Sequence, residues 1–391
     1  MGIEVRKISI GLYRNQERSF ASFILHWRGA AGFSVMPDEP GAQARHRCAT
    51  KQFIFNRRQT MIPERLRIFP RARHFVACLL ASVLAAPALA QAQAFPSKPV
   101  TMVLAYPAGS VSDLLARGLA TQLQSLWKQP VLVDNRPGAN QIIATQYVKQ
   151  ANPDGYTLLL ADDGAFTLNP HLYDKLPYAL KDFSPLADIA QLQMALSVTR
   201  DLPAKTLAEL VAYGKASPGK LNYASFGVGN ITHLSLETFK KTAGFDMVHI
   251  AYKGYPPAIA DVLSGQVQMV LGGLGGPVLQ HFRTGAMRPL AVTGKARSKL
   301  LPDVPTFIEA GYPGFNPEVN FLLLAPAGVP QAIAQKINTD AITAIKAITT
   351  STLEPNGMRP MGSSREQILA SLQSGAVNYA AVVKSVGVKL D

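Results

Sequence analysis

One arrangement occurs twice in this chain and constrains its fold more than any other feature: an apolar strand, a glycine-containing turn and a helix, in that order. In the first copy, a strand at 100–106 (VTMVLAY) leads through the turn at 107–110 (PAGS) into a helix at 113–127. In the second copy, a strand at 221–225 leads through the turn at 226–230 (FGVGN) into a helix from Ile231 to about Ala243. The N-terminus of each helix presents free backbone N–H groups, which attract anions. Two such ends, about 120 residues apart, predict two lobes that grip one small anion.

Residues 61–94 have the three parts of a secretory signal peptide. Four arginines precede an apolar run of 12 residues at 75–86, and an Ala-Leu-Ala cleavage site follows. We therefore expect export to the periplasm, with a mature chain that begins at Gln91 or Phe95. Residues 1–60 are interpreted as a misassigned start or a disordered extension.

The charge of the chain is concentrated in its first 90 residues, which hold 14 of the 39 basic and 5 of the 25 acidic residues. The remainder has a surplus of only five positive charges, and no basic run with interleaved aromatic residues, so we expect no nucleic-acid partner. Both cysteines, Cys48 and Cys78, also lie in this first part. The mature chain therefore has no thiol for a disulfide, a nucleophile or a metal site.

Strand and helix patterns alternate along the mature chain. This alternation predicts an α/β fold with mostly parallel sheets, in which ligands bind beyond the carboxyl ends of the strands. Besides the two copies above, strands are expected at 131–133, 156–161, 247–252, 267–271, 289–293 and 320–325, and helices at 140–150, 257–264, 331–348 and 364–385.

The first turn supplies five candidate ligand-binding residues. Small residues at Ala108, Gly109 and Ser110 allow backbone N–H groups to approach an anion closely. Tyr106 and Pro107 are expected to form the wall beside them. Asp113 fits better as half of a capping box with Ser110 than as a ligand contact, because a carboxylate would repel a carboxylate ligand.

The second turn supplies a matching set. Gly227 and Gly229 permit a tight turn after Phe226, Asn230 is a good N-cap, and Thr232 offers a hydroxyl group in the first helical turn. His233 is expected to be satisfied by the local backbone, although it could also contact a ligand.

Residues that follow other strands complete the candidate site. The pair Asp162-Asp163 is expected to be solvated rather than to bind a metal ion, because no third ligand is spaced nearby. Lys253 is expected to be exposed. The further ligand-binding candidates are Asp163, Gly164, Asn169, Tyr252 and Gly254.

The motifs of common enzyme sites are absent from the sequence. It has no H-E-x-x-H, C-x-x-C or G-x-S-x-G motif, and neither glycine turn carries the lysine of a P-loop. We therefore predict a binding protein that is not an enzyme, with no catalytic residue, cofactor or metal ligand. Two alternatives remain open: a ligand-sensing receptor domain for a signalling partner, and a periplasmic enzyme that acts on a carboxylate.

Ten short segments between Phe95 and Asp391 are similar to those of a known family. They are FPSKP at 95–99, YPAGSVSDLLAR at 106–117, DNRPGA at 134–139, PDGYTL at 153–158, LNP at 168–170, KLPY at 175–178, THL at 232–234, HIAYKG at 249–254, LPDVPTFIEAGYPGF at 301–315 and LAPAGVP at 324–330. In this order and spacing, they resemble the tripartite tricarboxylate transporter solute receptors, often called the Bug family. Asn140 and Gln141 depart from the pattern, because the family commonly has a glycine pair there.

The resemblance implies a two-lobed periplasmic-binding-protein fold, the Venus flytrap, with helices on both faces of each sheet and two crossings between the lobes. We expect crossings near 193–198 and 315–320, which give a first lobe of 95–195 with 320–391 and a second lobe of 196–319. The implied function is capture of a small organic carboxylate in the cleft and its delivery, by a monomer, to the large and small membrane subunits of a tripartite tricarboxylate transporter.

Overall fold

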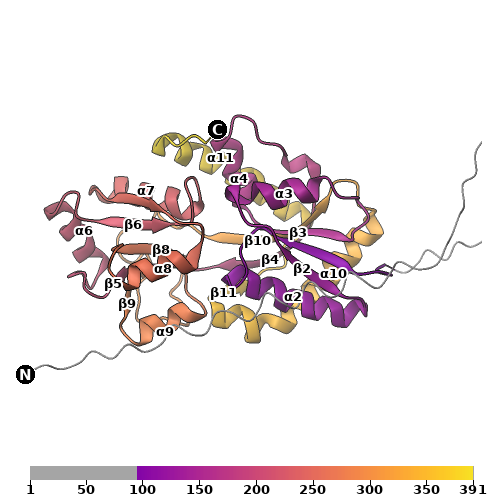
Figure 1. The fold of residues 1–391 in the computed structure, drawn as a ribbon, viewed down its shortest axis with the longest axis horizontal. Coiled ribbons are helices and arrows are strands. Elements are labelled where there is room, and N and C mark those ends of the chain that lie inside the picture. The colour runs from indigo at the N-terminus through magenta and orange to yellow at the C-terminus, as the bar shows by residue number, and fades with distance from the viewer. Residues whose placement is uncertain (1–94, 391) are drawn as a thin grey trace, which may run out of the picture. The chain divides into compact units, whose positions relative to one another are not determined.

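The structure is a computed structural model that describes residues 95–390. The signal peptide and the expectations for residues 1–60 lie outside the described residues. Residues 95–390 form two lobes, each built on one sheet with flanking helices, which confirms the expected two-lobed α/β fold (Figure 1). Within this range, no helix combines the length and the apolar character needed to cross a membrane.

The first lobe contains a six-stranded sheet in the order β11-β4-β10-β3-β1-β2. Its strands are β1 (Val100–Leu104), β2 (Val131–Asn135), β3 (Thr157–Asp162), β4 (Phe183–Leu192), β10 (Val319–Pro326) and β11 (Met358–Pro360). Its helices are α2 (Val111–Trp127), α3 (Ile142–Lys149), α4 (Gly164–Thr167), α5 (Asn169–Leu172), α10 (Gln331–Ile348) and α11 (Arg365–Val386). Short helical turns are η1 (Ala139–Gln141), η2 (Leu180–Asp182), η3 (Thr349–Leu353) and η4 (Glu354–Asn356).

The second lobe contains a five-stranded sheet in the order β7-β6-β8-β5-β9. Its strands are β5 (Met194–Thr199), β6 (Asn222–Ser225), β7 (Val248–Ala251), β8 (Met269–Gly273) and β9 (Met287–Val292). Its helices are α6 (Leu207–Ala216), α7 (Ile231–Ala243), α8 (Tyr255–Leu263) and α9 (Pro277–Arg283).

Both sheets are mixed, so the expectation of mostly parallel sheets is wrong. β1 pairs in parallel with β2 and β3, and β6 pairs in parallel with β7 and β8, as the strand–turn–helix copies require. The antiparallel pairs involve the strands that carry the chain between the lobes. β4 continues through Gln193 into β5 and so carries the chain from the first lobe to the second, whereas β10 carries it back. β10 is therefore antiparallel to both β4 and β3. β5 runs against β8 and β9 for the same reason, because it enters the second lobe where β8 ends.

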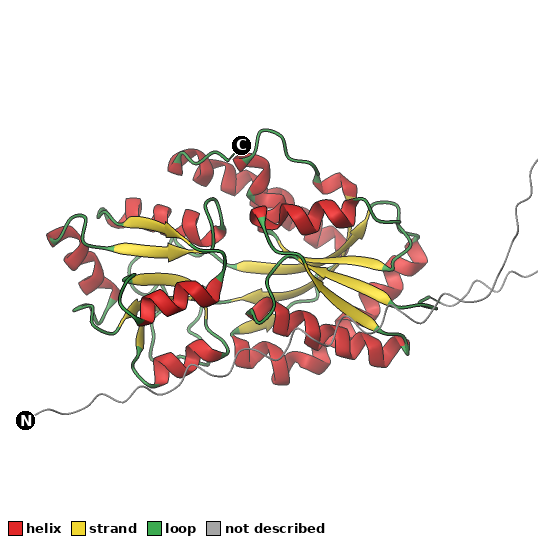
Figure 2. Ribbon diagram, in the orientation of Figure 1, coloured by secondary structure: helices red, strands yellow, loops and turns green. Residues whose placement is uncertain are grey.

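Alternate residues of the strand before the first turn pack on opposite faces of the sheet. Met102 and Leu104 join a buried cluster with α2 and α10, whereas Val103 joins another with α3, α4 and α11. Figure 2 shows these helices on both sides of the strands. Each fully buried aliphatic side chain of this kind contributes about 1.5–3 kcal/mol. The packing therefore fixes β1 on both faces and holds the turn at its carboxyl end.

Candidate ligand-binding site

A cavity lies between the two lobes, where the strands of both strand–turn–helix copies end. It has about 90 Å³ of space for water-sized spheres. Among the described residues that line it, none carries a charged side chain. The sixteen lining residues are Tyr106, Pro107, Ser110, Val111, Ser112, Leu192, Met194, Phe226, Asn230, Ile231, Thr232, Gly254, Tyr255, Gly273, Val319 and Phe321.

Three helices begin at this cavity: α2 after its N-cap Ser110, α7 after Asn230 and α8 after Gly254. The first turn of a helix leaves backbone N–H groups without partners inside the helix, and these carry partial positive charge. The amides of Val111 and Ile231 have no hydrogen-bond partner within residues 95–390, and both residues line the cavity. The cavity therefore receives free donors from both lobes.

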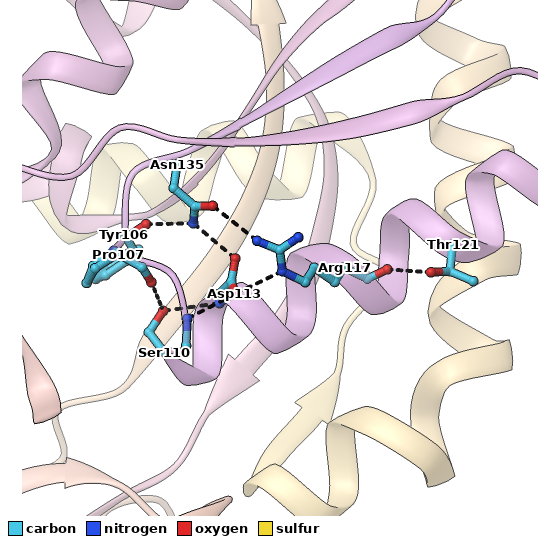
Figure 3. Close-up of polar contacts among 8 residues, drawn as sticks. Tyr106, Pro107, Ser110, Asp113, Arg117, Thr121 and Asn135 are labelled. Atoms are coloured by element: carbon cyan, nitrogen blue, oxygen red, sulfur yellow. Dashed lines mark hydrogen bonds and ion pairs between the residues drawn. The ribbon is translucent and has the colours of Figure 1, made fainter. Parts of the chain in front are cut away.

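The carboxylate of Asp113 holds the first turn in place (Figure 3). It accepts hydrogen bonds from the Gly109 amide at 3.0 Å, from Arg117 Nε at 2.9 Å and from Asn135 Nδ2 at 3.0 Å. The Asp113 amide donates in return to Ser110 Oγ at 3.2 Å. Asp113 thus supports the cap as expected, although its carboxylate binds the Gly109 amide and not the Ser110 amide that a capping box would use.

Arg117, Gly109 and Asn135 also set the ionisation of this carboxylate. Burial alone would raise the pKa of Asp113, but the hydrogen bonds from these three residues outweigh it and lower the pKa below its ordinary value. Asp113 is therefore a stable anion that belongs to the turn, and it is not among the residues that line the cavity.

Neutral groups hold the second turn. Asn230 Oδ1 accepts from the Thr232 amide at 3.0 Å, and Thr232 Oγ1 accepts from the Phe226 amide at 3.2 Å. The Gly229 amide donates to His233 Nδ1 at 3.1 Å, which confirms that His233 is satisfied by the local backbone. Burial, together with the stacked ring of His249 at 3.9 Å between centroids, lowers the pKa of His233 to about 4.

The donors that remain free agree only in part with the expected ones: the Ile231 amide lies within the second turn as expected, but other amides of the turns are already bonded. The amides of Gly109, Gly229 and Thr232 all bond within their own turns, because the capping side chains reach back to them. The first residues of a helix have no acceptor for their amides within that helix, so the amides of Val111, Ser112 and Ile231 are free. The Ser112 hydroxyl is also without a partner within residues 95–390, although the residue is only 6% exposed.

About half of the residues proposed from the sequence line the cavity. These are Tyr106, Pro107, Ser110, Phe226, Asn230, Thr232 and Gly254. Those that support the turns or neighbouring elements without lining the cavity are Ala108, Gly109, Gly227, Gly229, Tyr252, Asp163, Gly164 and Asn169. Tyr252, for example, donates to Asp261 Oδ2 at 2.6 Å, and Asn169 Nδ2 donates to the Asn140 carbonyl at 2.7 Å.

Asp162 is buried and Asp163 is half-buried, so the expectation of a solvated pair is wrong. Asp162 accepts from the Tyr106 hydroxyl and from Gln141 Nε2, and Asp163 accepts from Asn320 Nδ2 at 2.7 Å. Burial, which is the main cause, raises the pKa of Asp162 to about 8 and that of Asp163 to about 6. The pair is largely shielded from solvent because β3, which ends at Asp162, lies between β1 and β10. It supports the cavity indirectly, through Tyr106 and through β10.

A strained turn of the first lobe is hydrogen-bonded to the second lobe. Ala139, Asn140 and Gln141 have φ values of 44°, 47° and 74°, a left-handed conformation that costs non-glycine residues roughly 1–2 kcal/mol each. Their side chains use this conformation: Asn140 Nδ2 donates to the Val228 carbonyl of the other lobe at 2.8 Å, while Gln141 binds Asp162. The residues that stand in place of the family's glycine pair thus make contacts that glycine could not.

Sequence reasoning missed the part of the wall that comes from the lobe-crossing strands. Leu192 ends β4, Met194 begins β5, and Val319 begins β10. No local sequence pattern identifies such residues, because the strands that carry them come together only in the folded chain. Ser112 could have been found, since it is the second helical residue after the N-cap Ser110.

Comparisons with known proteins agree with this geometry. The sequence profile of the tripartite tricarboxylate transporter family receptors matches residues 115–388. A UPF0065 protein of Bordetella bronchiseptica is 38% identical over 317 residues, which cover 80% of this chain and 93% of that relative.

Solved structures show the same architecture. The periplasmic binding protein BugD is 29% identical with a TM-score of 0.69, and the match covers 75% of this chain and 99% of BugD. A protein of R. palustris solved with adipate is 32% identical with a TM-score of 0.71, and the match again covers 75% of this chain and 99% of the other. Both are similar along nearly their whole length to the part of the chain that forms the two lobes.

Proposed function

Because this chain belongs to the tripartite tricarboxylate transporter receptor family, we propose that it is a periplasmic solute-binding protein that captures a small organic carboxylate between its lobes. The observation that carries the proposal is the convergence of free donors from both lobes, at Val111, Ser112 and Ile231, on one cavity. The relative solved with adipate supports the same class of ligand.

The chemistry of the donors suits a carboxylate. A carboxylate has two oxygens and about four lone-pair sites, so it can accept bonds from several amides at once. An anion at a helix N-terminus gains typically 0.3–1 kcal/mol, and up to about 2 kcal/mol where the geometry is partly buried. In this arrangement, Val111 and Ser112 bind the ligand from the first lobe, and Ile231 binds it from the second.

Capture from both lobes suggests how the protein acts. A ligand that bonds to α2 and α7 together stabilises the arrangement in which the lobes meet, and hinge closure of this kind presents a surface that the open protein lacks. The membrane subunits of a tripartite transporter would recognise that surface on an exported monomer. The protein binds without catalysis, in keeping with relatives whose solved structures are those of binding proteins.

A thermal-shift screen of mono-, di- and tricarboxylates with the purified protein tests the proposal. A ligand at about 100 times its dissociation constant stabilises a protein by roughly 2.7 kcal/mol, a readily measured shift. We expect a carboxylate that binds one to one and is recovered unchanged. Failure of every carboxylate to bind, or its conversion to product, would contradict the proposal.

The hydroxyl group of Ser112 gives a sharper test. Ser112→Ala should weaken carboxylate binding about tenfold, which corresponds to one hydrogen bond to a charged group, while stability stays unchanged. Ser125→Ala is the matched control, because Ser125 is an exposed serine of the same helix α2. Equal affinities for the two variants, measured by titration calorimetry, would remove Ser112 from the site.

A further inference from the structure

Much of the cavity wall is apolar. Leu192, Met194 and Val319 come from the strands that cross between the lobes, and all three are more than nine-tenths buried. The rings of Phe226 and Phe321 complete this wall. A ligand whose charged end meets the helix N-termini therefore has its remainder against hydrocarbon.

Three of the hydroxyl groups that line the same cavity, those of Tyr106, Thr232 and Tyr255, already have partners. The Tyr255 hydroxyl donates to the Gly273 carbonyl at 3.0 Å, and the Tyr106 hydroxyl donates to Asp162. Thr232 Oγ1 bonds to Asn230 Oδ1 at 3.1 Å while it accepts from the Phe226 amide. Unused donors lie instead at the helix starts, so the cavity offers one polar end.

A second carboxylate on the ligand would have nothing to pair with. Within the described lining no lysine, arginine or histidine is present. Burial of an ionised carboxylate without a partner is strongly unfavourable. Each methylene that is buried against an apolar wall, in contrast, raises affinity about fourfold.

On the premise of the proposed function, we propose that the ligand is a monocarboxylate with an apolar remainder, aliphatic or aromatic, and that this chain discriminates against dicarboxylates. The size of the cavity limits that remainder. One water needs about 10–15 Å³ on this measure, so a cavity of about 90 Å³ holds several waters, or a small organic acid in their place. Straight-chain acids of medium length and simple aromatic acids are of this size.

Matched ligands test the inference on the unmodified protein. Hexanoate and adipate have the same carbon chain and differ only in the second carboxylate, and hexanamide replaces the single carboxylate by a neutral group. By titration calorimetry we expect hexanoate to bind at least tenfold more tightly than adipate, and hexanamide to bind most weakly. Benzoate and terephthalate form a second, aromatic pair with the same expected order.

The outcomes separate this inference from the proposed function. Binding of adipate as tight as that of hexanoate, or tighter, overturns the inference and leaves carboxylate capture intact. Hexanamide binding as tightly as hexanoate overturns the proposed function, because the charge would then be irrelevant. If no acid of either pair binds but another carboxylate of the thermal-shift screen does, the inference fails and the proposed function stands; if no carboxylate binds, both fail.

A single substitution should reverse the preference. Met194→Lys places an ammonium group on a side chain of similar length in the apolar wall, so the ratio of adipate to hexanoate affinity should rise at least tenfold. Val377→Lys is the matched control, since Val377 is 73% exposed on α11, and it should leave the ratio unchanged. An unchanged ratio in a folded Met194→Lys protein would argue against the assigned wall. The ligand pairs decide the question independently if this variant does not fold.

Discussion

The two turns that open onto the cavity share a backbone design but differ in what holds them. In the first lobe, the carboxylate of Asp113 binds the turn and is paired with Arg117, which is half exposed. In the second lobe, neutral groups hold the turn. His233 occupies the position in the second turn that is equivalent to Asp113 in the first. Each is the third helical residue and binds the amide just before the N-cap.

The difference follows from the surroundings. Arg117 reaches solvent and can accompany a buried anion, so a charge is tolerated in the first turn. His233 stacks on His249, which in turn stacks on Tyr223, in the packed interior of the second lobe, where an ion would lose its hydration. The strand–turn–helix pattern therefore specifies a backbone, and the local environment decides whether its anchor is charged.

Removal of the charged anchor should have the largest effect. Asp113→Ala removes a buried carboxylate that accepts hydrogen bonds from the Gly109 amide, Arg117 and Asn135, so we expect a loss of about 2–4 kcal/mol in the free energy of unfolding. Urea denaturation measures it. Asp201→Ala, at an aspartate whose side chain is 81% exposed, is the control. A loss no larger than that of the control would show that the first turn holds without its carboxylate.

Acidification should distinguish the two turns. The pKa of His233 is about 4 in the folded chain and ordinarily about 6.5, so its contribution to stability is complete above pH 6.5 and is lost as the pH falls toward 4. The pKa of Asp113 is lowered from 3.8, so the first turn keeps its contribution until below that pH. Between pH 6.5 and 4, the second turn is thus the sensitive one.

His233→Gln, which keeps a neutral acceptor, isolates this effect. From pH 6.5 to 5 the original protein should lose about 2 kcal/mol more than the variant in urea denaturation. The raised pKa values of Asp162 and Asp163 act in the opposite direction, but equally in both proteins. His281→Gln in α9 is the control. Parallel pH curves for the original protein and His233→Gln would mean that the second turn is no more acid-sensitive than the first.

Exchange of the two N-caps should have the smallest effect. Ser110→Ala and Asn230→Ala should each cost about 1 kcal/mol, because each removes one bond to a helical amide. Ser110→Asn and Asn230→Ser should recover most of that loss, since either side chain supplies the acceptor. Thermal denaturation measures these differences. If the exchanged variants were as unstable as the alanine variants, the backbones of the two turns would not be equivalent.

The sequence predicted the parts of the fold that depend on local signals. The second helix of the pair was expected at 231–243 and is α7, Ile231–Ala243, because Asn230 caps it and Gly244 ends it. β4 was missed, since Pro185 and Asp188 are unusual within a strand. The structure accommodates them through register shifts against β10 and a hydrogen bond from Ser363 to Asp188.

The sequence predicted where the candidate site lies, but only some of the residues and amides that form it. Both glycine turns reach the cavity, as their position after parallel strands requires. The identity of the free amides depended on whether Asp113 and His233 point back to Gly109 and Gly229, which spacing alone does not decide. The residues of the apolar wall could not be predicted, because they lie on the antiparallel strands that cross between the lobes, whereas the sequence indicated mainly parallel sheets.

The absence of fixed charge in the described cavity wall has a consequence for kinetics. Partial charges on helix ends act only within about the first turn, so the wall exerts no long-range pull on an anion in solution. Encounter at this site should then proceed by ordinary diffusion, and its rate should change little with ionic strength, unlike capture by a cleft lined with lysine or arginine. Discrimination among ligands would therefore reside in how long each one stays bound.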